Sequence, residues 1–212
     1  MKQPKRVLDL FCGAGGAAMG LHQAWPEAEI IGVDIKKQPR YPFQFIWADA
    51  LEYLDSYDRT YPYQFIWASP PCQHYTQMLN HGLTPRSNHP DLLAPTRERM
   101  NSIPWVIENV AGAPLINPIM LCGEMFGLRV TRHRFFETSF IAQPPAHPVH
   151  RGTGIRKQSD GGYYFRVYGH ETGKAQWGAA MGIDWMKSPE LAQAIPPAYS
   201  RYIAEQFSKG AE

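Results

Sequence analysis

The sequence lacks the features that would assign it to several special classes of protein. No apolar run approaches the ~18 residues of a membrane-spanning helix, and the first residues have no apolar core of a signal peptide. Its 21 basic and 19 acidic side chains leave a net charge of only +2, which does not by itself indicate a nucleic-acid partner. We therefore expect an ordinary globular protein without a membrane partner, and 212 residues suffice for one sizeable core.

Cysteine is also scarce. Cys12, Cys72 and Cys122 include no Cys-x-x-Cys pair and are too few for a disulfide framework, which favours a reducing cytoplasm. We expect Cys122 to be structural. The eight histidines include no pair at i, i+4 around a glutamate, so the sequence predicts no metal site.

The chain begins with the pattern of a nucleotide-binding α/β domain. Residues 6–11 predict a strand, a glycine-rich turn follows, and residues 19–24 predict a helix. Gly13 and Gly15 can adopt positive φ and let the backbone approach a ligand. Gly13-x-Gly15-x-x-Ala18 also fits a dinucleotide fingerprint, but nicotinamide enzymes usually carry a substrate domain, for which this chain has little room.

Two further predicted strands each lead to an aspartate. The run at 29–33 ends at Asp34, where a carboxylate can bind ribose hydroxyls, and the run at 43–47 leads to Asp49. In methyl-donor enzymes the second position commonly receives the adenine amino group. Asp49 could equally cap the helix predicted around residues 51–54, so both roles stay open.

The most informative stretch is Ser69-Pro70-Pro71-Cys72-Gln73, which follows a strand predicted at residues 63–68. Strand ends are where an open α/β sheet places its chemistry, and two prolines stiffen the turn before the cysteine. Cys72 is therefore a candidate nucleophile, although most free cysteines are small buried hydrophobes. The polar, turn-rich residues 74–88 predict a lid beside it.

Charged side chains also accompany two later predicted strands. The strand at 105–110 ends in Glu108 and Asn109, and a buried carboxylate needs a partner. The strand at 131–137 begins with Arg132 and Arg134, whose period-two spacing puts both on one face. The plain alternative for the arginines is a solvated sheet edge that discourages further strand pairing.

The remaining segments are less regular. Residues 120–128 predict a short helical bridge. From 141 to 176 proline, glycine, basic and aromatic residues predominate, which suits contact with phosphates and bases but equally suits a plain surface loop. The C-terminal part predicts a helix at 189–194 capped by Ser188, and a last amphipathic helix that starts at two prolines and runs to residue 207.

Taken in order, these motifs resemble the cytosine-C5 DNA methyltransferases over essentially the whole chain. Asp9-Leu-Phe-Cys-Gly-Ala-Gly-Gly16 is similar to the family's first motif, and Pro71-Cys72-Gln73, Glu108-Asn109-Val110 and Arg132-x-Arg134 are similar to three further signatures. The resemblance implies four catalytic residues: Cys72, Glu108, Arg132 and Arg134. It also implies that S-adenosylmethionine is bound by Asp9, Phe11, Gly13, Gly15, Asp34, Asp49, Pro71 and Gln193.

The resemblance further implies an α/β, Rossmann-like S-adenosylmethionine-dependent methyltransferase fold with a mostly parallel central sheet. Residues 1–140 and 177–212 would form the catalytic domain, and residues 141–176 a very small target-recognition insertion. We expect a compact, phage-like monomer that acts on double-stranded DNA in the cytoplasm of a bacterial host cell.

The implied reaction methylates C5 of a flipped cytosine through a covalent bond between Cys72 and C6, because C5 becomes nucleophilic only after such an addition. Ser69-Pro70 is also similar to amino-methyltransferases, but those need an aromatic residue where this chain has Cys72. Gln193 replaces the family's usual asparagine. The same chemistry on a free cytosine nucleotide or RNA, or a non-catalytic nucleic-acid-binding relative, are the alternatives.

Overall fold

The computed structural model describes residues 3–75, 89–100, 102–150, 156–157, 163–165 and 174–210. Its centre is a seven-stranded sheet in the order β3-β2-β1-β4-β5-β7-β6, and β8 pairs with β9 separately. The strands are β1 (Arg6–Leu10), β2 (Glu29–Asp34), β3 (Gln44–Trp47), β4 (Phe65–Ala68), β5 (Trp105–Asn109), β6 (Ile119–Leu121), β7 (Arg134–Thr138), β8 (Arg156–Lys157) and β9 (Tyr163–Tyr164). The helices are α1 (Gly16–Ala24), α2 (Ala50–Ser56), α4 (Leu93–Arg99), α5 (Lys174–Met181), α6 (Ser188–Gln193) and α7 (Pro197–Lys209), with 3-10 helices η1 (Cys72–His74) and η3 (Gly123–Phe126). The predicted α/β architecture is confirmed.

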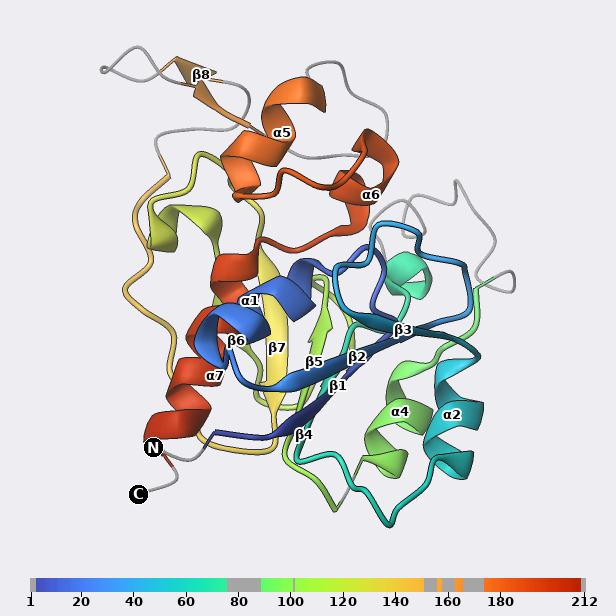
Figure 1. Ribbon diagram of the computed structural model, residues 1–212. Helices are drawn as coiled ribbons and strands as arrows, with labels where there is room; N and C mark the ends of the chain where they lie inside the picture. The colour runs from blue at the N-terminus through green and yellow to red at the C-terminus, as the bar shows by residue number, and fades with distance from the viewer. Residues whose placement is uncertain are drawn as a thin grey trace.

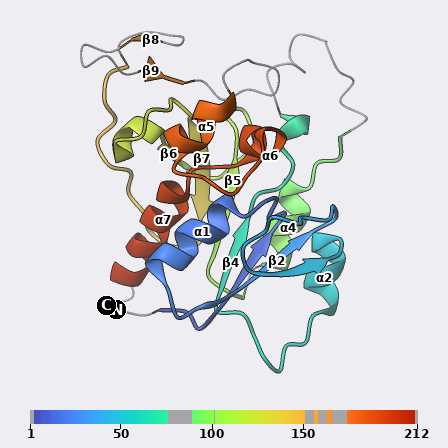
Figure 2. The same cartoon turned by 45° about the horizontal axis from the view of Figure 1, so that its top comes forward.

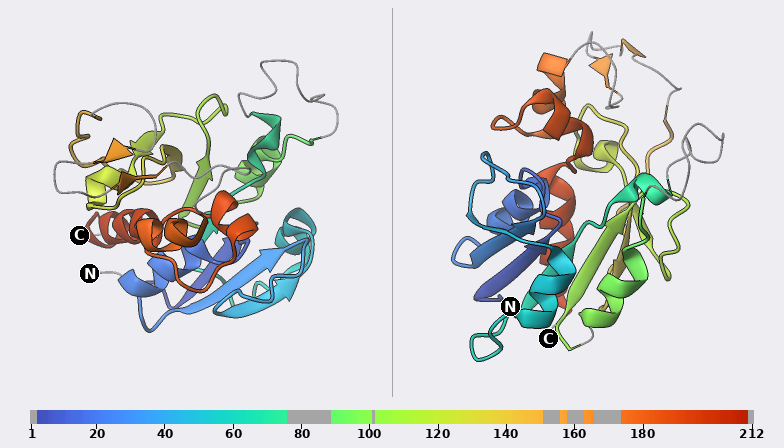
Figure 3. Two further views of the ribbon diagram at one scale, coloured as in Figure 1. Left: turned by 90° about the horizontal axis from the view of Figure 1, so that it is seen from above. Right: turned by 90° about the vertical axis from the view of Figure 1, so that its right-hand side faces the viewer.

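The parallel part of the sheet follows from the apolar character of its strands. β1 pairs in parallel with β2 and β4, and β5 continues the row beside β4. Val7, Leu8 and Leu10 of β1 are completely buried. Such continuous apolar strands need cover on both faces. Figure 1 and Figure 3 show α1 and α7 on one face of the sheet and α2 and α4 on the other.

The packing of α1 on α7 depends on a glycine. A Cβ atom at Gly20 would lie 2.0 Å from the carbonyl oxygen of Pro197 and 2.2 Å from Oγ of Ser200. The absent side chain therefore lets the two helix backbones approach closely, and the buried Leu21 and Ile203 extend this layer into one apolar cluster.

The direction of β7 decides which residues share an edge of the sheet. β7 runs antiparallel to both β5 and β6. Its first residue, Arg134, therefore lies at the edge where the parallel strands β4 and β5 end. Figure 2 shows α5 and α6 above this edge. Residues from the middle and the end of the sequence thus surround the carboxyl ends of the parallel strands.

Some local predictions were wrong. Residues 120–128 do not form a helical bridge throughout, because β6 pairs with β7 through Leu121 and only η3 follows. Ser188 is the first residue of α6 and makes no capping bond. The side chain of Glu190 accepts a hydrogen bond from the backbone N–H of Lys187 at 2.7 Å instead.

Most of the predicted lid at 74–88 and half of the predicted target-recognition segment at 141–176 lie outside the described residues. Among the described helices, none is long and apolar enough to cross a lipid bilayer.

Candidate active site

Cys72 lies at the carboxyl edge of the sheet. It is the first residue of η1, just beyond the end of β4, and its side chain is half-buried. The preceding turn is held by Asn109 at the end of β5, whose Nδ2 donates to the carbonyl oxygen of Pro70 at 3.0 Å. The Oδ1 atom of Asn109 accepts from the backbone N–H of Val110 at 2.9 Å. This buried amide therefore fixes the cysteine turn against the neighbouring strand.

Glu108, also on β5, forms an ion pair with Arg134 at the start of β7. Arg134 Nε lies 3.0 Å from Glu108 Oε1, and the two side chains are only 16% and 10% exposed. The pairing arises because the first residue of antiparallel β7 lies beside the last residues of parallel β5. The buried carboxylate thus has the partner that its position demands.

Arg132 has a different place from the one predicted. It precedes β7, so the two arginines do not share a strand face. Its side chain is 5% exposed, and Nη2 donates to the carbonyl oxygen of Ala192 in α6 at 2.7 Å. Its own carbonyl oxygen accepts a hydrogen bond from Tyr199 of α7 at 2.6 Å. Arg132 therefore connects the site to the two C-terminal helices.

The four predicted catalytic side chains form one electrostatic group. Burial raises the pKa of the Cys72 thiol, and the Glu108 carboxylate raises it further, while Arg134 and Arg132 lower it. Burial likewise raises the pKa of Glu108, against the opposing effect of the two arginines and a hydrogen bond from Ser69. Burial and the nearby Arg134 lower the pKa of Arg132. The charge of each of these groups therefore affects the protonation of the others.

The glycine-rich turn after β1 has the shape of a ligand cradle. Phe11 and Gly13 have φ angles of 54° and 49°, and a Cβ atom at Gly13 would meet no atom within 4 Å. Asp9 of β1 is fully buried and accepts a hydrogen bond from Tyr41 at 3.2 Å, whereas its Oδ1 atom has no partner. Burial raises the pKa of Asp9 to about 8. An unpartnered buried carboxyl oxygen beside an open glycine turn fits a cationic ligand such as S-adenosylmethionine.

The glycines and the acidic strand ends shape the same turn. Gly15 adopts a φ of 85°, and a Cβ there would lie 2.6 Å from Cδ of Pro42. Asp34 Oδ2 accepts from the N–H of Gly13 at 3.0 Å, so this carboxylate braces the turn. Asp49 caps α2, because its Oδ1 accepts from two backbone N–H groups of the first turn. Its capping role is thus confirmed, and a role toward adenine stays a prediction.

Pro71 and Gln193, the last two predicted cofactor residues, are exposed. Gln193 ends α6, which carries Ala192 and hence the contact with Arg132. A hollow of about 810 Å³ lies elsewhere, between α1 and the segment 178–191, and none of the predicted site residues lines it. The chemistry is therefore inferred from the side-chain cluster at the sheet edge.

The sequence prediction missed three contributors. Asn109 belongs to the Glu-Asn-Val motif, so its presence in the motif could have suggested its anchoring role. Ser69 bonds Glu108, and Trp185 Nε1 donates to the carbonyl oxygen of Ala14 at 2.8 Å, which ties the C-terminal segment to the glycine turn. Only a folded structure shows these two contacts.

Comparisons with known proteins agree with this geometry. Residues 5–90 match the family model of the C-5 cytosine-specific DNA methylases. No curated protein matches the chain. The structure of the methyltransferase EhMeth from Entamoeba histolytica is similar over 100% of both chains, with a TM-score of 0.62 at 13% identity, which shows a shared fold.

Two other solved structures align with 51% of this chain at a TM-score of 0.34. They are the plantazolicin methyltransferase BpumL, 40% covered at 16% identity, and coclaurine N-methyltransferase, 32% covered at 15% identity, both with S-adenosylhomocysteine. The similarity to EhMeth shows that the chain has the Rossmann-like fold of S-adenosylmethionine-dependent methyltransferases, and residues 5–90 are similar to the C-5 cytosine-specific DNA methylases.

Proposed function

We propose that the protein methylates C5 of cytosine in DNA, with Cys72 as the nucleophile and the cytosine flipped out of the duplex. The observation that carries this proposal is the Glu108–Arg134 ion pair next to a half-buried cysteine at the carboxyl edge of the sheet. A thiol, a carboxyl of raised pKa and a guanidinium are together what addition to a pyrimidine ring requires.

Cys72 acts at C6 of the cytosine ring and Glu108 at N3, and both promote the same movement of electrons through the ring. The sulfur forms a bond to C6, and the electrons of the C5–C6 double bond move through the ring. Glu108 relieves the resulting charge by giving a proton to N3, for which its burial-raised pKa suits it. When bound, S-adenosylmethionine supplies the electrophilic methyl group for C5. A base then takes the C5 proton, the electrons of that C–H bond form the C5–C6 double bond again and expel the Cys72 thiolate, and N3 returns its proton to Glu108.

The two arginines have roles that differ from that of Glu108. Arg134 is paired with Glu108 and 16% exposed, and we assign its remaining guanidinium N–H groups to O2 of the base. Arg132 is buried and bonded to α6, so we assign it to positioning and to electrostatic support of the cysteine thiolate. Arg132 and Arg134 both lower the pKa of Cys72, which favours the attacking thiolate.

The cofactor cradle is assigned from the same edge of the sheet. The open turn at Gly13 leaves room for the cofactor, Asp9 with its unpartnered Oδ1 lies buried on the strand before this turn, and Asp34 at the end of β2 is assigned to the ribose. Ile35, directly after Asp34, is 65% exposed and offers an apolar surface for an adenine ring. Phe11, Gly15, Asp49, Pro71 and Gln193 complete the predicted set.

The experiment that tests the function compares substrates directly. The protein is incubated with S-adenosylmethionine bearing a deuterated methyl group and with duplex DNA, RNA or dCMP, and the nucleosides are analysed by mass spectrometry. The proposal predicts labelled 5-methylcytosine in DNA only. Label in RNA or dCMP alone would replace the DNA substrate while keeping the chemistry, and no label in any of them would contradict the proposed activity.

A matched variant separates the chemical step from binding. Cys72→Ser is expected to abolish label transfer and to leave S-adenosylhomocysteine binding within about twofold, because the cysteine lies on β4's turn and the cradle on β1 and β2. Neither of the other cysteines gives a control, since Cys12 lies in the glycine turn itself and Cys122 directly follows β6, whose last residue pairs with Arg134 at the same edge of the sheet.

A further inference from the structure

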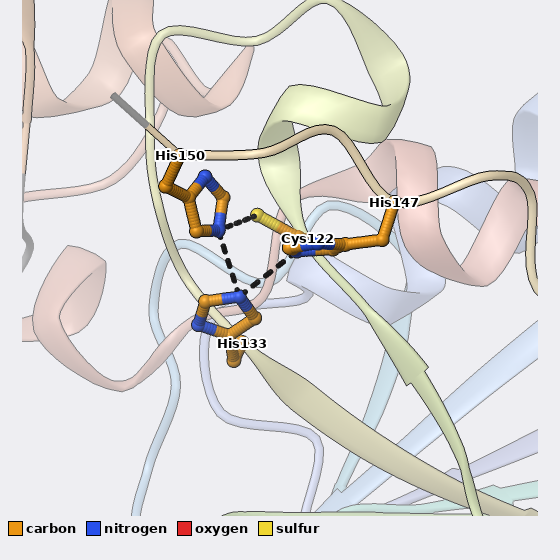
Figure 4. Close-up of side chains that lie close together, drawn as sticks. All are labelled: Cys122, His133, His147 and His150. Carbon is orange, nitrogen blue, oxygen red and sulfur yellow. Dashed lines mark hydrogen bonds between the residues drawn. The ribbon is translucent and has the colours of Figure 1, made fainter. Parts of the chain in front are cut away.

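Four ligand-type side chains outside the proposed active site converge on one point. Figure 4 shows Cys122, His133, His147 and His150, whose sulfur and nitrogen atoms all lie within 4.8 Å of one another. His150 Nε2 lies 2.9 Å from His133 Nε2 and 3.6 Å from the Cys122 sulfur, and His133 Nε2 lies 3.1 Å from His147 Nε2. The residues come from three separate segments. Cys122 directly follows β6, His133 directly precedes β7, and His147 and His150 lie in the segment 141–150.

The distances match those between ligands of one tetrahedral zinc ion. Zinc bonds of about 2.0 Å to nitrogen and about 2.3 Å to sulfur place two nitrogens about 3.3 Å apart and nitrogen and sulfur about 3.6 Å apart. The observed separations lie within a few tenths of an ångström of these values. The remaining pairs of ligand atoms lie within 4.8 Å, so shifts of about an ångström in the exposed side chains of His133 and His147 bring all four ligand atoms to these separations.

Hydrogen bonds serve this cluster poorly. Each imidazole nitrogen has one in-plane position, which holds either a proton or a lone pair. Nε2 of His133 faces Nε2 of both His147 and His150, so this single position would have to be shared between two partners and cannot point straight at both. Three lone pairs directed at one cation remove this conflict, whereas three protonated rings at this distance would repel one another.

Glu124 supplies the supporting contact that such a site uses. Its Oε1 lies 2.7 Å from Nδ1 of His150, although the approach lies outside hydrogen-bond angles. A carboxylate that accepts a hydrogen bond from Nδ1–H keeps the proton on that nitrogen. Nε2 of the same ring then carries a lone pair, which points at the other ligands. Carboxylate–histidine–zinc arrangements of this kind orient the ring and raise its basicity.

We propose that Cys122, His133, His147 and His150 bind one structural zinc ion, with Glu124 as the carboxylate that orients His150. Four protein ligands close the coordination sphere, so the ion would be structural and would not activate water. The site reverses the expectation of no metal drawn from the sequence. It also joins His133, between Arg132 and Arg134, to the end of the segment at 141–150, and thereby fixes that segment to the proposed active site.

The test is zinc content of the full-length, untagged protein, which avoids the metal affinity of a histidine tag. Protein is purified with a non-chelating phosphine reductant, equilibrated with micromolar zinc and desalted, and its zinc is measured by mass spectrometry. We expect about one zinc per chain, and an unchanged value in the control variant His22→Gln, whose histidine lies on α1 outside the cluster.

The ligand variants must lose the ion. Cys122→Ser removes a completely buried side chain and could disturb folding, so His147→Gln, at an exposed position, is measured alongside it. Both should fall well below one zinc per chain while circular dichroism stays like that of wild type. Glu124→Gln should keep zinc but weaken its affinity about 10- to 100-fold.

Cobalt substitution gives an independent readout. The cobalt form should show the strong visible bands of a tetrahedral ion and a near-ultraviolet sulfur-to-cobalt band that Cys122→Ser abolishes. A folded wild-type protein that retains no zinc and gives no tetrahedral cobalt spectrum would overturn the proposal. Zinc retained equally by wild type, Cys122→Ser and His147→Gln would overturn it as well. Neither measurement depends on methyl transfer.

Discussion

Removing Arg134 should expose how strongly the buried Glu108 carboxylate depends on its partner. At the observed separation of 3.0 Å, the attraction between the two charges is on the order of 5 kcal/mol for an effective dielectric constant of about 20. Breaking such a pair from one side usually costs about 3–5 kcal/mol, because the remaining charge stays buried. In Arg134→Met, however, Glu108 can take up a proton instead of staying charged.

Proton uptake sets a ceiling on the loss. The ordinary pKa of glutamate is 4.5, and burial already raises that of Glu108, which losing Arg134 would raise further. The folded variant then binds a proton that the unfolded chain releases above pH 4.5, so its stability falls as the pH rises through that range. Between pH 4.5 and pH 7, two and a half pH units at about 1.4 kcal/mol each limit the loss to about 3.5 kcal/mol. We expect about 2 kcal/mol at pH 7, and almost none of this electrostatic loss near pH 4.5.

Urea unfolding at pH 7 and pH 5 measures this difference, with each variant compared to wild type at the same pH. The double variant Arg134→Met/Glu108→Gln should be more stable than Arg134→Met at pH 7, because it buries no unpaired charge. Arg201→Met is the control, since Arg201 and Glu205 form an exposed pair on α7 that contributes less than about 0.5 kcal/mol. A loss of equal size at both pH values, or a double variant no more stable than Arg134→Met, would refute the reasoning.

Three further predictions concern other parts of the molecule. Asp9→Asn should become more stable relative to wild type as the pH rises from about 4 toward 8, by up to ~1.4 kcal/mol per pH unit, because folded wild type keeps on Asp9 a proton that the unfolded chain releases. A difference in unfolding free energy that does not change with pH over this range would contradict it. Asn109→Leu should lower kcat about tenfold or more with little change in the KM for S-adenosylmethionine, because the carbonyl oxygen of Pro70 loses its hydrogen bond and the cysteine turn is no longer fixed. An unchanged kcat would show that the turn keeps its position without Asn109. Gly20→Ala should destabilise the fold by about 1–3 kcal/mol in thermal unfolding, because its Cβ would lie 2.0 Å from the Pro197 carbonyl, and an unchanged midpoint would mean that α7 shifts freely.

The sequence predicted the site best where the chemistry sits on consecutive parallel strands. Cys72 and Glu108 follow apolar runs that end at the same edge of any parallel sheet, so their meeting follows from the fold class. The place of Arg134 needed one more fact, the antiparallel direction of β7, which the spacing of apolar residues does not reveal. Period-two spacing placed Arg132 on the strand, whereas its burial against α6 depends on how the C-terminal helices return to the sheet.

Contacts between distant segments account for the rest of what the sequence did not predict. A metal site is predictable from sequence where its ligands recur at a short, regular spacing, and Cys122, His133, His147 and His150 are not spaced in that way. They meet because β6 and β7 form a hairpin-like pair and the chain after residue 141 folds back over it. The Asp49 cap, by contrast, was predictable, because a carboxylate directly before a helix is a local signal.

The covalent bond between Cys72 and a cytosine ring is the central claim, and a suicide substrate tests it most directly. Random-sequence duplexes containing 5-fluorocytosine, whose C5 fluorine cannot leave as a proton, are incubated with the protein and S-adenosylmethionine. We predict a complex that survives denaturation, whose peptide mass locates the modified base on Cys72, and which Cys72→Ser does not form. A folded protein that binds S-adenosylhomocysteine, forms no such adduct and leaves ordinary duplexes without 5-methylcytosine would contradict the account.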